Sequence, residues 1–257
     1  MGVGRVPKRI RQVVIGVNAA DAQIKLGLLS QAELNCNTAL KLANRIHAQH
    51  MAAQIHNTLG IAYFYQGRYD DALASYREAQ RIHQALGSAY EEGDVLINIS
   101  LVHSAVGTHS LAIEAAQQAL ERAEAIQSQR LKAEALIAQA EALLIVNQIQ
   151  EVITAATAAL ELADQLGSSY DQALALRLLG QASARSHLPF DTYFEQSITL
   201  LNTIKHSFGL ARTWAEYGRA LVESGNNRDG TAYVLQAQQA FTTIGAQGEL
   251  ARITQAH

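Results

Sequence analysis

The stretch LGIAYFYQGRYDDALASYREA, residues 59–79, decides the fold. Its first half carries Gly60 among apolar residues, and its second half carries Tyr76 followed by Ala79. Two helices cross closely only where neither backbone carries a large side chain, so Gly60 and Ala79 predict a tight contact between two helices. Gly67 lies between the halves, and glycine is the residue that most readily ends a helix. The stretch therefore predicts two antiparallel helices joined by a short turn.

Small residues return along the chain at nearly constant spacing, with successive steps of 40, 40, 40, 40 and 38 residues. This first series consists of Ala20, Gly60, Ser100, Ala140, Gly180 and Gly218. A second series marks the last small residue of each second helix, and it consists of Ala39, Ala79, Ala119, Ala159, Ser197 and Ala237. Both series lose two residues near Ser186–Pro189, so one deletion explains both. Self-similarity at a fixed period indicates a repeat protein.

A third series marks the end of each first helix. It consists of Gly27, Gly67, Gly107, Asn147 and Gly225. Glycine and asparagine best tolerate the left-handed conformation that ends a helix. The three series together predict a helix, a short turn and a second helix in every repeat.

These positions resemble the tetratricopeptide repeat, with a small residue in the first helix (helix A) and an alanine–aromatic–alanine pattern in the second (helix B). Tyr63 lies three residues after Gly60, and Trp214 falls where the family places its tryptophan. The 40-residue unit, with a long helix B ending at Gly87 or Gly167, is similar to the repeats of bacterial MalT-type regulator sensor arrays and of kinesin light chains. The resemblance implies an all-α fold, a right-handed α-solenoid of about six helix hairpins.

We expect a single solenoid over residues 1–257, with repeats at about 13–52, 53–92, 93–132, 133–172, 173–210 and 211–250. The basic segment 1–12 is expected to be flexible. Within each hairpin the small positions should face each other, while Tyr63, Tyr76 and Leu96 should fill the layers between hairpins. No hairpin buries its apolar face alone, so stacking of neighbours supplies the core.

Composition narrows the class of protein. Hydrophobic residues make up 49% of the chain and prolines number two, as expected of an all-helical protein, because proline disrupts helix interiors. The net charge of −3 leaves no basic stripe for phosphates, so nucleic acid is not an expected partner. One cysteine, Cys36, excludes an internal disulfide. No apolar run reaches the ~18 residues of a membrane helix, which leads us to expect a cytoplasmic protein and no membrane partner.

The sequence offers no catalytic or cofactor motif, which predicts a protein that is not an enzyme and has no metal or cofactor. His47 and His50 share a helix face, but a third metal ligand is lacking. Cys36 stands at the aromatic position of a helix B and is expected to be a small buried residue. An enzyme using Glu141 and Arg177 together is the least favoured alternative.

The resemblance implies a peptide-binding groove on the concave face, lined by helix A residues at fixed offsets from each small position. Carried over to this sequence, the offsets give Asn57, Ile61, Phe64, Tyr65, Asn98, Leu101, Ser104, Glu141, Arg177, Gln181, Arg185 and Arg219. An asparagine amide both donates and accepts hydrogen bonds, so it can hold a peptide backbone whatever its side chains. The carboxylate clamp of chaperone-binding members is not matched, because Ile97 and Ile137 occupy its polar positions.

The groove residues change from apolar to basic along the chain. This gradient predicts a protein or peptide partner with an apolar stretch and an acidic end, since arginine pairs with carboxylates. The leading hypothesis is a protein- or peptide-binding scaffold, of the kind that forms the sensor part of a bacterial signalling or transcriptional regulator. The alternative is a structural scaffold that self-assembles through its ends or its convex face, and the oligomeric state stays open.

Overall fold

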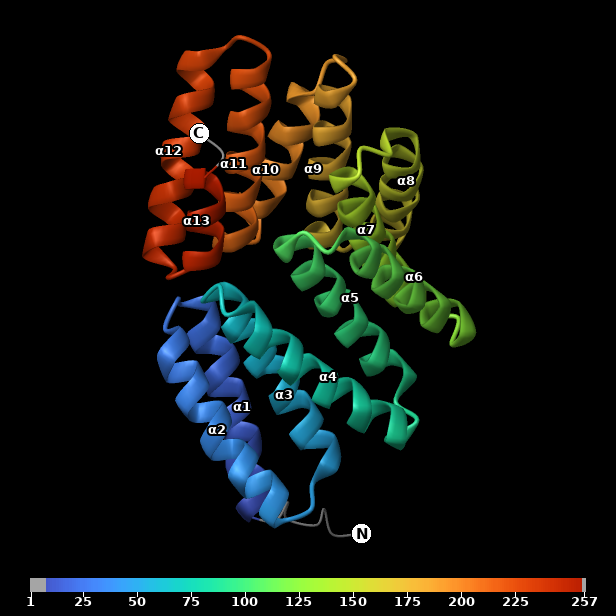
Figure 1. Ribbon diagram of the computed structural model, residues 1–257, viewed down its shortest axis with the longest axis vertical. Helices are drawn as coiled ribbons and strands as arrows, with labels where there is room; N and C mark the ends of the chain where they lie inside the picture. The colour runs from blue at the N-terminus through green and yellow to red at the C-terminus, as the bar shows by residue number, and fades with distance from the viewer. Residues whose placement is uncertain (1–7, 256–257) are drawn as a thin grey trace.

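The computed structural model describes residues 8–255, which form thirteen helices and no strand (Figure 1). The helices are α1 (Lys8–Lys25), α2 (Leu29–Arg45), α3 (Gln49–Tyr65), α4 (Tyr69–Leu86), α5 (Ala89–Val106), α6 (His109–Ala125), α7 (Gln129–Ile145), α8 (Ile149–Leu166), α9 (Ser169–Arg185), α10 (Asp191–Thr203), α11 (Ser207–Glu223), α12 (Asn227–Thr243) and α13 (Gln247–Gln255). The expectation of an all-α solenoid of about six hairpins is confirmed.

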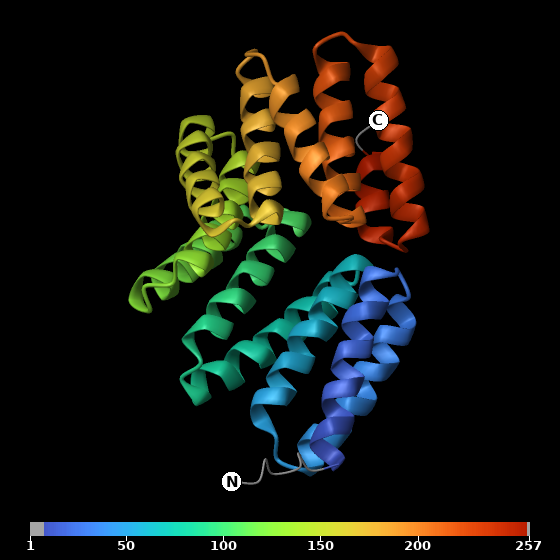
Figure 2. The same cartoon turned by 180° about the vertical axis from the view of Figure 1, so that it is seen from behind.

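Each odd-numbered helix from α1 to α11 is a helix A, and it packs antiparallel against the helix B that follows it. Helix A also contacts the helix A of the next hairpin, as α5 does with α7 and α7 with α9. Helix B also contacts the helix A that follows it, as α6 does with α7, so the hairpins stack through both helices and wind into a right-handed superhelix (Figures 1 and 2).

Residues in the left-handed backbone conformation follow the ends of the helices, as the third series predicted. Gly67 has a φ of 76° and Asn147 a φ of 60°. The same conformation recurs where helix B ends, for example at Gly87 with a φ of 66°. In the repeat that lacks two residues, His187 adopts a φ of 57°, so the turn is kept without glycine or asparagine. The turns thus follow the 40-residue period.

The small positions are buried at close helix contacts. A side chain on Gly60 would overlap the ring of Tyr76, and a Cβ on Gly180 would lie 2.9 Å from the ring of Phe194. The expectation that small residues face each other is therefore wrong at these two positions, where glycine makes room for an aromatic ring of the same hairpin. Tyr76 also packs against Val95 and Ile99 of α5, so its ring fills the layer between two hairpins as expected.

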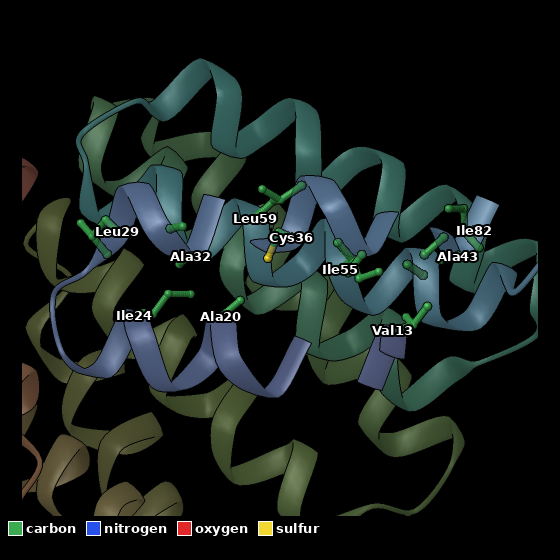
Figure 3. Packing of buried hydrophobic residues seen from close by; sticks show 14 residues of the cluster. Val13, Ala20, Ile24, Leu29, Ala32, Cys36, Ala43, Ile55, Leu59 and Ile82 are labelled. Carbon is green, nitrogen blue, oxygen red and sulfur yellow. The ribbon is translucent and has the colours of Figure 1, made fainter. Parts of the chain in front are cut away.

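The first two hairpins enclose a dry apolar core, seen from close by in Figure 3. Val13, Cys36 and Ile55 are fully buried there, which confirms that Cys36 acts as a small core residue. Burial and the nearby Asp21 raise the pKa of the Cys36 thiol to about 12. Fully burying a side chain such as Ile55 contributes roughly 1.5–3 kcal/mol, so this core holds adjacent hairpins together.

The helix boundaries differ from the repeat limits that we expected. α3 begins at Gln49 rather than at residue 53, and α5 begins at Ala89 rather than at 93. The N-cap residues Ala48 and Ser88 accept no side-chain hydrogen bond, and Ala48 has no polar group that could accept one. Residues 8–12 form the first turns of α1 instead of a flexible segment, because Val13 anchors this helix in the core. Residues 1–7 lie outside the described residues.

The two ends of the superhelix meet. α13 contacts α3, and in both views the last helices lie against the turns that follow α1 and α3 (Figures 1 and 2). In an open solenoid each repeat touches its neighbours alone. Here the closing contact encloses the concave face.

Candidate functional site

The concave face contains a cavity of about 390 Å³. Five A helices, α3, α5, α7, α9 and α11, contribute its walls. The lining residues are Ile61, Phe64, Tyr65, Tyr76, Asp94, Ile97, Asn98, Leu101, Arg130, Glu134, Ile137, Ala138, Glu141, Ser168, Tyr170, Asp171, Leu174, Phe208 and Arg212. We call this space the concave cavity. Its size lies within the range of ligand sites, which is roughly 300–1,000 Å³.

Aromatic side chains form one wall of the concave cavity. The ring centroids of Tyr65 and Phe208 are 4.3 Å apart, and those of Phe64 and Tyr65 are 5.9 Å apart. Burial raises the pKa of the Tyr65 hydroxyl, so this group stays neutral over the physiological range. The wall offers an apolar surface with aromatic faces to a ligand.

A buried charge cluster lies beside the aromatic wall. The Glu141 carboxylate, 8% exposed, pairs with the Arg177 guanidinium and lies 3.4 Å from that of Arg212. Burial favours the neutral acid, but Arg212 and Arg177 outweigh this effect and lower the pKa of Glu141. Glu141 is therefore ionised at neutral pH. One carboxylate thus serves two guanidinium groups, and the Arg212 side chain is 20% exposed.

Carboxylates gather at another part of the cavity wall. Burial raises the pKa of Asp94, although a hydrogen bond from Asn57 opposes the shift. Burial also raises the pKa of Glu134, whose Oε1 accepts a hydrogen bond from Arg130 Nε at 3.1 Å. This part of the cavity is acidic, whereas near Arg212 the two arginines Arg177 and Arg212 are paired with Glu141 and Glu249.

The two expected asparagines are bonded to each other. Asn98 Nδ2 donates to Asn57 Oδ1 at 3.1 Å, and Asn57 Nδ2 donates to Asp94 Oδ2 at 3.0 Å. The chain of bonds fixes the orientation of both amides. The side-chain carbonyl oxygen of Asn98 takes no part in these two hydrogen bonds, and Asn98 lies at the cavity wall.

The structure brings half of the expected groove residues to the concave cavity. They are Ile61, Phe64, Tyr65, Asn98, Leu101 and Glu141. Asn57 lies beside them and is joined to the wall through Asn98 and Asp94. Arg177 is 1% exposed and lies behind Glu141, so its side chain positions Glu141 instead of facing the cavity.

The other expected residues lie away from the cavity. The Ser104 hydroxyl is buried and has no hydrogen-bond partner in the described residues. Arg185 is exposed and donates to the carbonyl oxygen of Leu144, while Arg219 Nη1 lies 3.0 Å from Glu216 Oε2. Gln181 is half-buried. The superhelix curves, so equivalent offsets in distant repeats do not reach one space.

Several lining residues were missed by the offsets used. Asp94 and Glu134 each stand six residues before a small position, and Tyr170 and Phe208 stand ten before. A helix has about 3.6 residues per turn, so these positions lie one and two turns earlier on the same face. Counting back by whole turns from the expected residues would have found them.

The described helices offer little for a metal ion or a membrane. No group of three or more His, Cys, Asp or Glu side chains in residues 8–255 is arranged to hold a metal. His50 lies 3.5 Å from Glu91 and packs edge-on against the His83 ring, so it has a partner other than His47. Among the helices of the same residues, none has the length and apolar character to cross a membrane.

Comparison with known proteins agrees with the repeat pattern. A family model described as tetratricopeptide repeat matches residues 15–85 and 51–125. Residues 15–125 therefore carry tetratricopeptide-type repeats. The repeats resemble those of regulators: the chain is 30% identical over 117 residues to the regulatory protein AfsR of Streptomyces griseus. This match spans 46% of the chain and 12% of AfsR, so most of that protein has no counterpart here.

Solved structures share the tetratricopeptide fold at low identity. Aspartyl phosphate phosphatase F from Bacillus subtilis has a TM-score of 0.78 at 14% identity, over 91% of this chain and 61% of that one. NprR, solved in complex with its cognate peptide NprX, has a TM-score of 0.69 at 16% identity, over 98% of this chain and 75% of that one. These similarities establish the helical repeat fold.

Proposed function

We propose that the chain is a scaffold that binds a peptide, or a peptide segment of a partner protein, in the concave cavity. The observation that carries the proposal is the cavity, which combines an apolar wall with a few oriented polar groups, as ligand sites do. The peptide complex of NprR, which has the same fold, supports this use of the tetratricopeptide array. The proposed activity is binding, with no chemical step.

The aromatic wall supports an apolar side chain as the anchor of the ligand. Phe64, Tyr65 and Phe208 present ring faces and edges to the cavity. Burying a Leu- or Phe-sized side chain there would contribute roughly 1.5–3 kcal/mol. A single well-placed apolar residue of the peptide therefore accounts for a large part of the expected affinity.

Arg212 supports an acidic group next to that anchor. Its guanidinium lines the cavity, and it shares Glu141 with Arg177. A ligand carboxylate would bind the exposed part of the Arg212 guanidinium, beside Glu141 and Glu249. Arginine binds carboxylates with paired hydrogen bonds, which favours this contact over a water molecule.

The asparagine pair supports recognition of the peptide backbone. Asn98 is held by its bond to Asn57, so its carbonyl oxygen keeps one direction at the cavity wall. This oxygen accepts a hydrogen bond from a backbone N–H of an extended segment. Such a bond is independent of the ligand sequence, which leaves specificity to the aromatic wall and Arg212.

Fluorescence anisotropy with a library of labelled hexapeptides tests the proposal. The library contains one apolar residue at varied positions, with an acidic or an amide residue at the end. We expect saturable binding of peptides that carry both the apolar and the acidic residue. The Arg212→Gln variant should lose the preference for the acidic end, and exposed Arg228→Gln on α12 is the matched control. Equal binding of all peptides by both variants contradicts the proposal.

A regulatory role is a finer proposal. The similarity to AfsR, a regulatory protein, supports the view that the array is the sensor part of a bacterial regulator. The occupied cavity would then change the shape of the superhelix. A pull-down with wild-type protein and with an Asn57→Ala/Asn98→Ala variant tests this role, since a regulatory partner should be lost from the variant alone.

Self-assembly is the second candidate, and one observation favours it. Ile15, Leu26 and Leu34 are exposed apolar side chains on the first hairpin, which has one neighbouring hairpin in the described residues instead of two. Stacking of two copies through this end would cover them. Light scattering over a range of concentrations separates the candidates, because end-stacking grows with concentration and peptide binding does not.

A further inference from the structure

The two ends of the superhelix meet along a line that we call the seam. On one side lie Gly27 and Gly67, in the turns that follow α1 and α3. On the other side lie Ile244, Gly245 and Gly248, at the end of α12 and the start of α13. The seam closes the superhelix (Figure 2).

Glycine makes the close approach at the seam possible. A Cβ on Gly27 would overlap the backbone of Ile244. A Cβ on Gly248 would lie 3.1 Å from the Cα of Gly67 and 3.2 Å from the carbonyl oxygen of Phe64, tighter than ordinary contact. The seam is therefore mainly a contact of backbone against backbone, joined by the Tyr69 hydroxyl, which would lie 2.9 Å from a Cβ on Gly248. A side chain at Gly27 would force the two sides apart.

The seam is weak compared with the contacts between neighbouring hairpins. Within residues 8–255, no hydrogen bond or ion pair joins the turns after α1 and α3 to the segment 244–248. Van der Waals contact and the Tyr65–Phe208 ring pair hold the two sides together. Contacts with few buried apolar groups open more readily than packed cores. The superhelix should therefore open at the seam before its hairpins separate.

The seam and the concave cavity share structural parts. Tyr65 comes from the α3 side and Phe208 from the α11 side, and both line the cavity. Glu249, next to Gly248, lies 3.9 Å from Arg212, which also lines the cavity. Opening the seam would separate the two halves of the aromatic wall, whereas Glu249 and Arg212 lie on the same side of the seam and would stay together. The cavity has its observed shape only while the seam is closed.

We propose that the seam is a reversible closure that sets the shape of the concave cavity. In the open state α13 parts from the turns after α1 and α3, and Tyr65 separates from Phe208. On the basis of the proposed function, a peptide that touches α3 and α11 together holds the seam shut. Coupling between seam closure and peptide binding is reciprocal, so a variant that opens the seam must weaken peptide binding.

The Gly248→Leu variant tests the closure without any ligand. Gly248 has an ordinary helical backbone and lies outside the cavity lining, so leucine suits α13 itself. Across the seam it would meet the Tyr69 hydroxyl and the backbone of Gly67 and Phe64. Ala251→Leu, on the exposed face of the same helix, is the matched control. Small-angle X-ray scattering should give a larger maximum dimension for Gly248→Leu alone. A folded Gly248→Leu protein with wild-type dimensions would overturn the proposal.

A second measurement keeps the test independent of how that variant folds. Nitroxide labels on cysteines at exposed positions 26 and 242 report the distance across the seam by double electron–electron resonance, and buried Cys36 does not compete for labelling. In low concentrations of urea, a longer distance should appear before helical circular dichroism is lost. A distance that lengthens only with global unfolding would refute a separate opening of the seam.

Peptide titrations then test the coupling. A hexapeptide selected on the wild-type protein should bind Gly248→Leu about ten-fold more weakly and should shift the labelled pair toward the short distance. Equal affinity for Gly248→Leu and Ala251→Leu would overturn the coupling. A wild-type protein that binds no library peptide contradicts the proposed function, while the scattering and distance results still decide whether the seam opens.

Discussion

The aromatic ring of Tyr65 on α3 stacks against that of Phe208 on α11, with centroids 4.3 Å apart and planes inclined by 34°. The two residues come from distant repeats, and both line the concave cavity. A pair of packed aromatic rings contributes about 0.5–1.5 kcal/mol beyond the area that it buries. This pair therefore links the closing of the superhelix to the wall of the proposed binding site.

A double-mutant cycle measures that link. Tyr65→Ala and Phe208→Ala should each lower the free energy of unfolding, and the double variant should lose less than the sum. We expect a coupling energy of about 1 kcal/mol from urea denaturation. Tyr65→Ala combined with Phe190→Ala, a ring from another aromatic cluster, serves as the control and should give additive losses. Additivity in the Tyr65–Phe208 cycle would contradict the contact.

Replacing Asn98 by alanine should weaken peptide binding with little loss of stability. Asn98→Ala removes one partly buried hydrogen bond and the carbonyl oxygen at the cavity wall. Losing a hydrogen bond to a ligand costs about 0.5–1.5 kcal/mol, so peptide affinity should fall by roughly two- to ten-fold. Exposed Asn202→Ala on α10 is the matched control. Unchanged affinity for Asn98→Ala would show that the asparagine lies outside the binding surface.

Replacing Gly60 by leucine should greatly lower the free energy of unfolding. A leucine there would overlap the ring of Tyr76, which is fully packed in the second hairpin. Overfilling a packed core costs about 1–3 kcal/mol and sometimes more. Gly60→Leu should therefore unfold at a markedly lower urea concentration than Ala74→Leu, which adds the same side chain to the exposed face of α4. Equal unfolding midpoints would contradict the helix contact.

Glu141 predicts a charge-dependent stability. Arg212 and Arg177 hold its pKa below the usual value of about 4.3, so its stabilising effect is present above that pH and is lost as the pH falls through the lowered pKa. Glu141→Gln leaves two buried arginines without their shared carboxylate, and it should cost about 3–5 kcal/mol at pH 7.

Urea denaturation at pH 7 and at successively lower pH below about 4.3 measures how the stability contributed by Glu141 changes with pH. The difference between wild-type protein and Glu141→Gln should shrink as the pH falls. Glu134→Gln is a useful contrast, because burial raises the pKa of Glu134 and the stability that it contributes is present at low pH and lost as the pH rises. A constant difference for Glu141→Gln across this range would rule out the charged cluster.

His83 predicts a loss of stability in mild acid. The ring is 1% exposed, its Nδ1 has no hydrogen-bond partner among residues 8–255, and burial lowers its pKa despite the opposing effect of Glu91. The stabilising effect of a lowered pKa is present above the usual value of about 6.5 and disappears as the pH falls through the folded value. The melting temperature of the wild-type protein should fall more steeply from pH 8 to pH 5 than the melting temperature of His83→Leu. Parallel curves would contradict this account.

The sequence alone determined the repeat and most of the fold. A spacing of 40 residues between small positions is a local property, because each small residue permits one close contact between helices that are adjacent in the chain. The left-handed ends of the helices are also local, which is why Gly67 and Asn147 could be predicted. Helix starts such as Gln49 lacked a capping signal and were placed four residues too late.

The candidate site depended more on tertiary structure. The lining residues of the second and third repeats were predicted because neighbouring repeats share one local geometry; they are Ile61, Phe64, Tyr65, Asn98 and Leu101. Arg185 and Arg219 were also predicted, but they lie outside the cavity because the same offsets were carried too far along a curved array. Tertiary structure alone decided that Arg177 is buried and that Phe208 meets Tyr65. The physical reason is that small rotations between hairpins add up over the whole chain. Where its ends meet, and which side chains share the concave cavity, depends on that sum and on no single repeat.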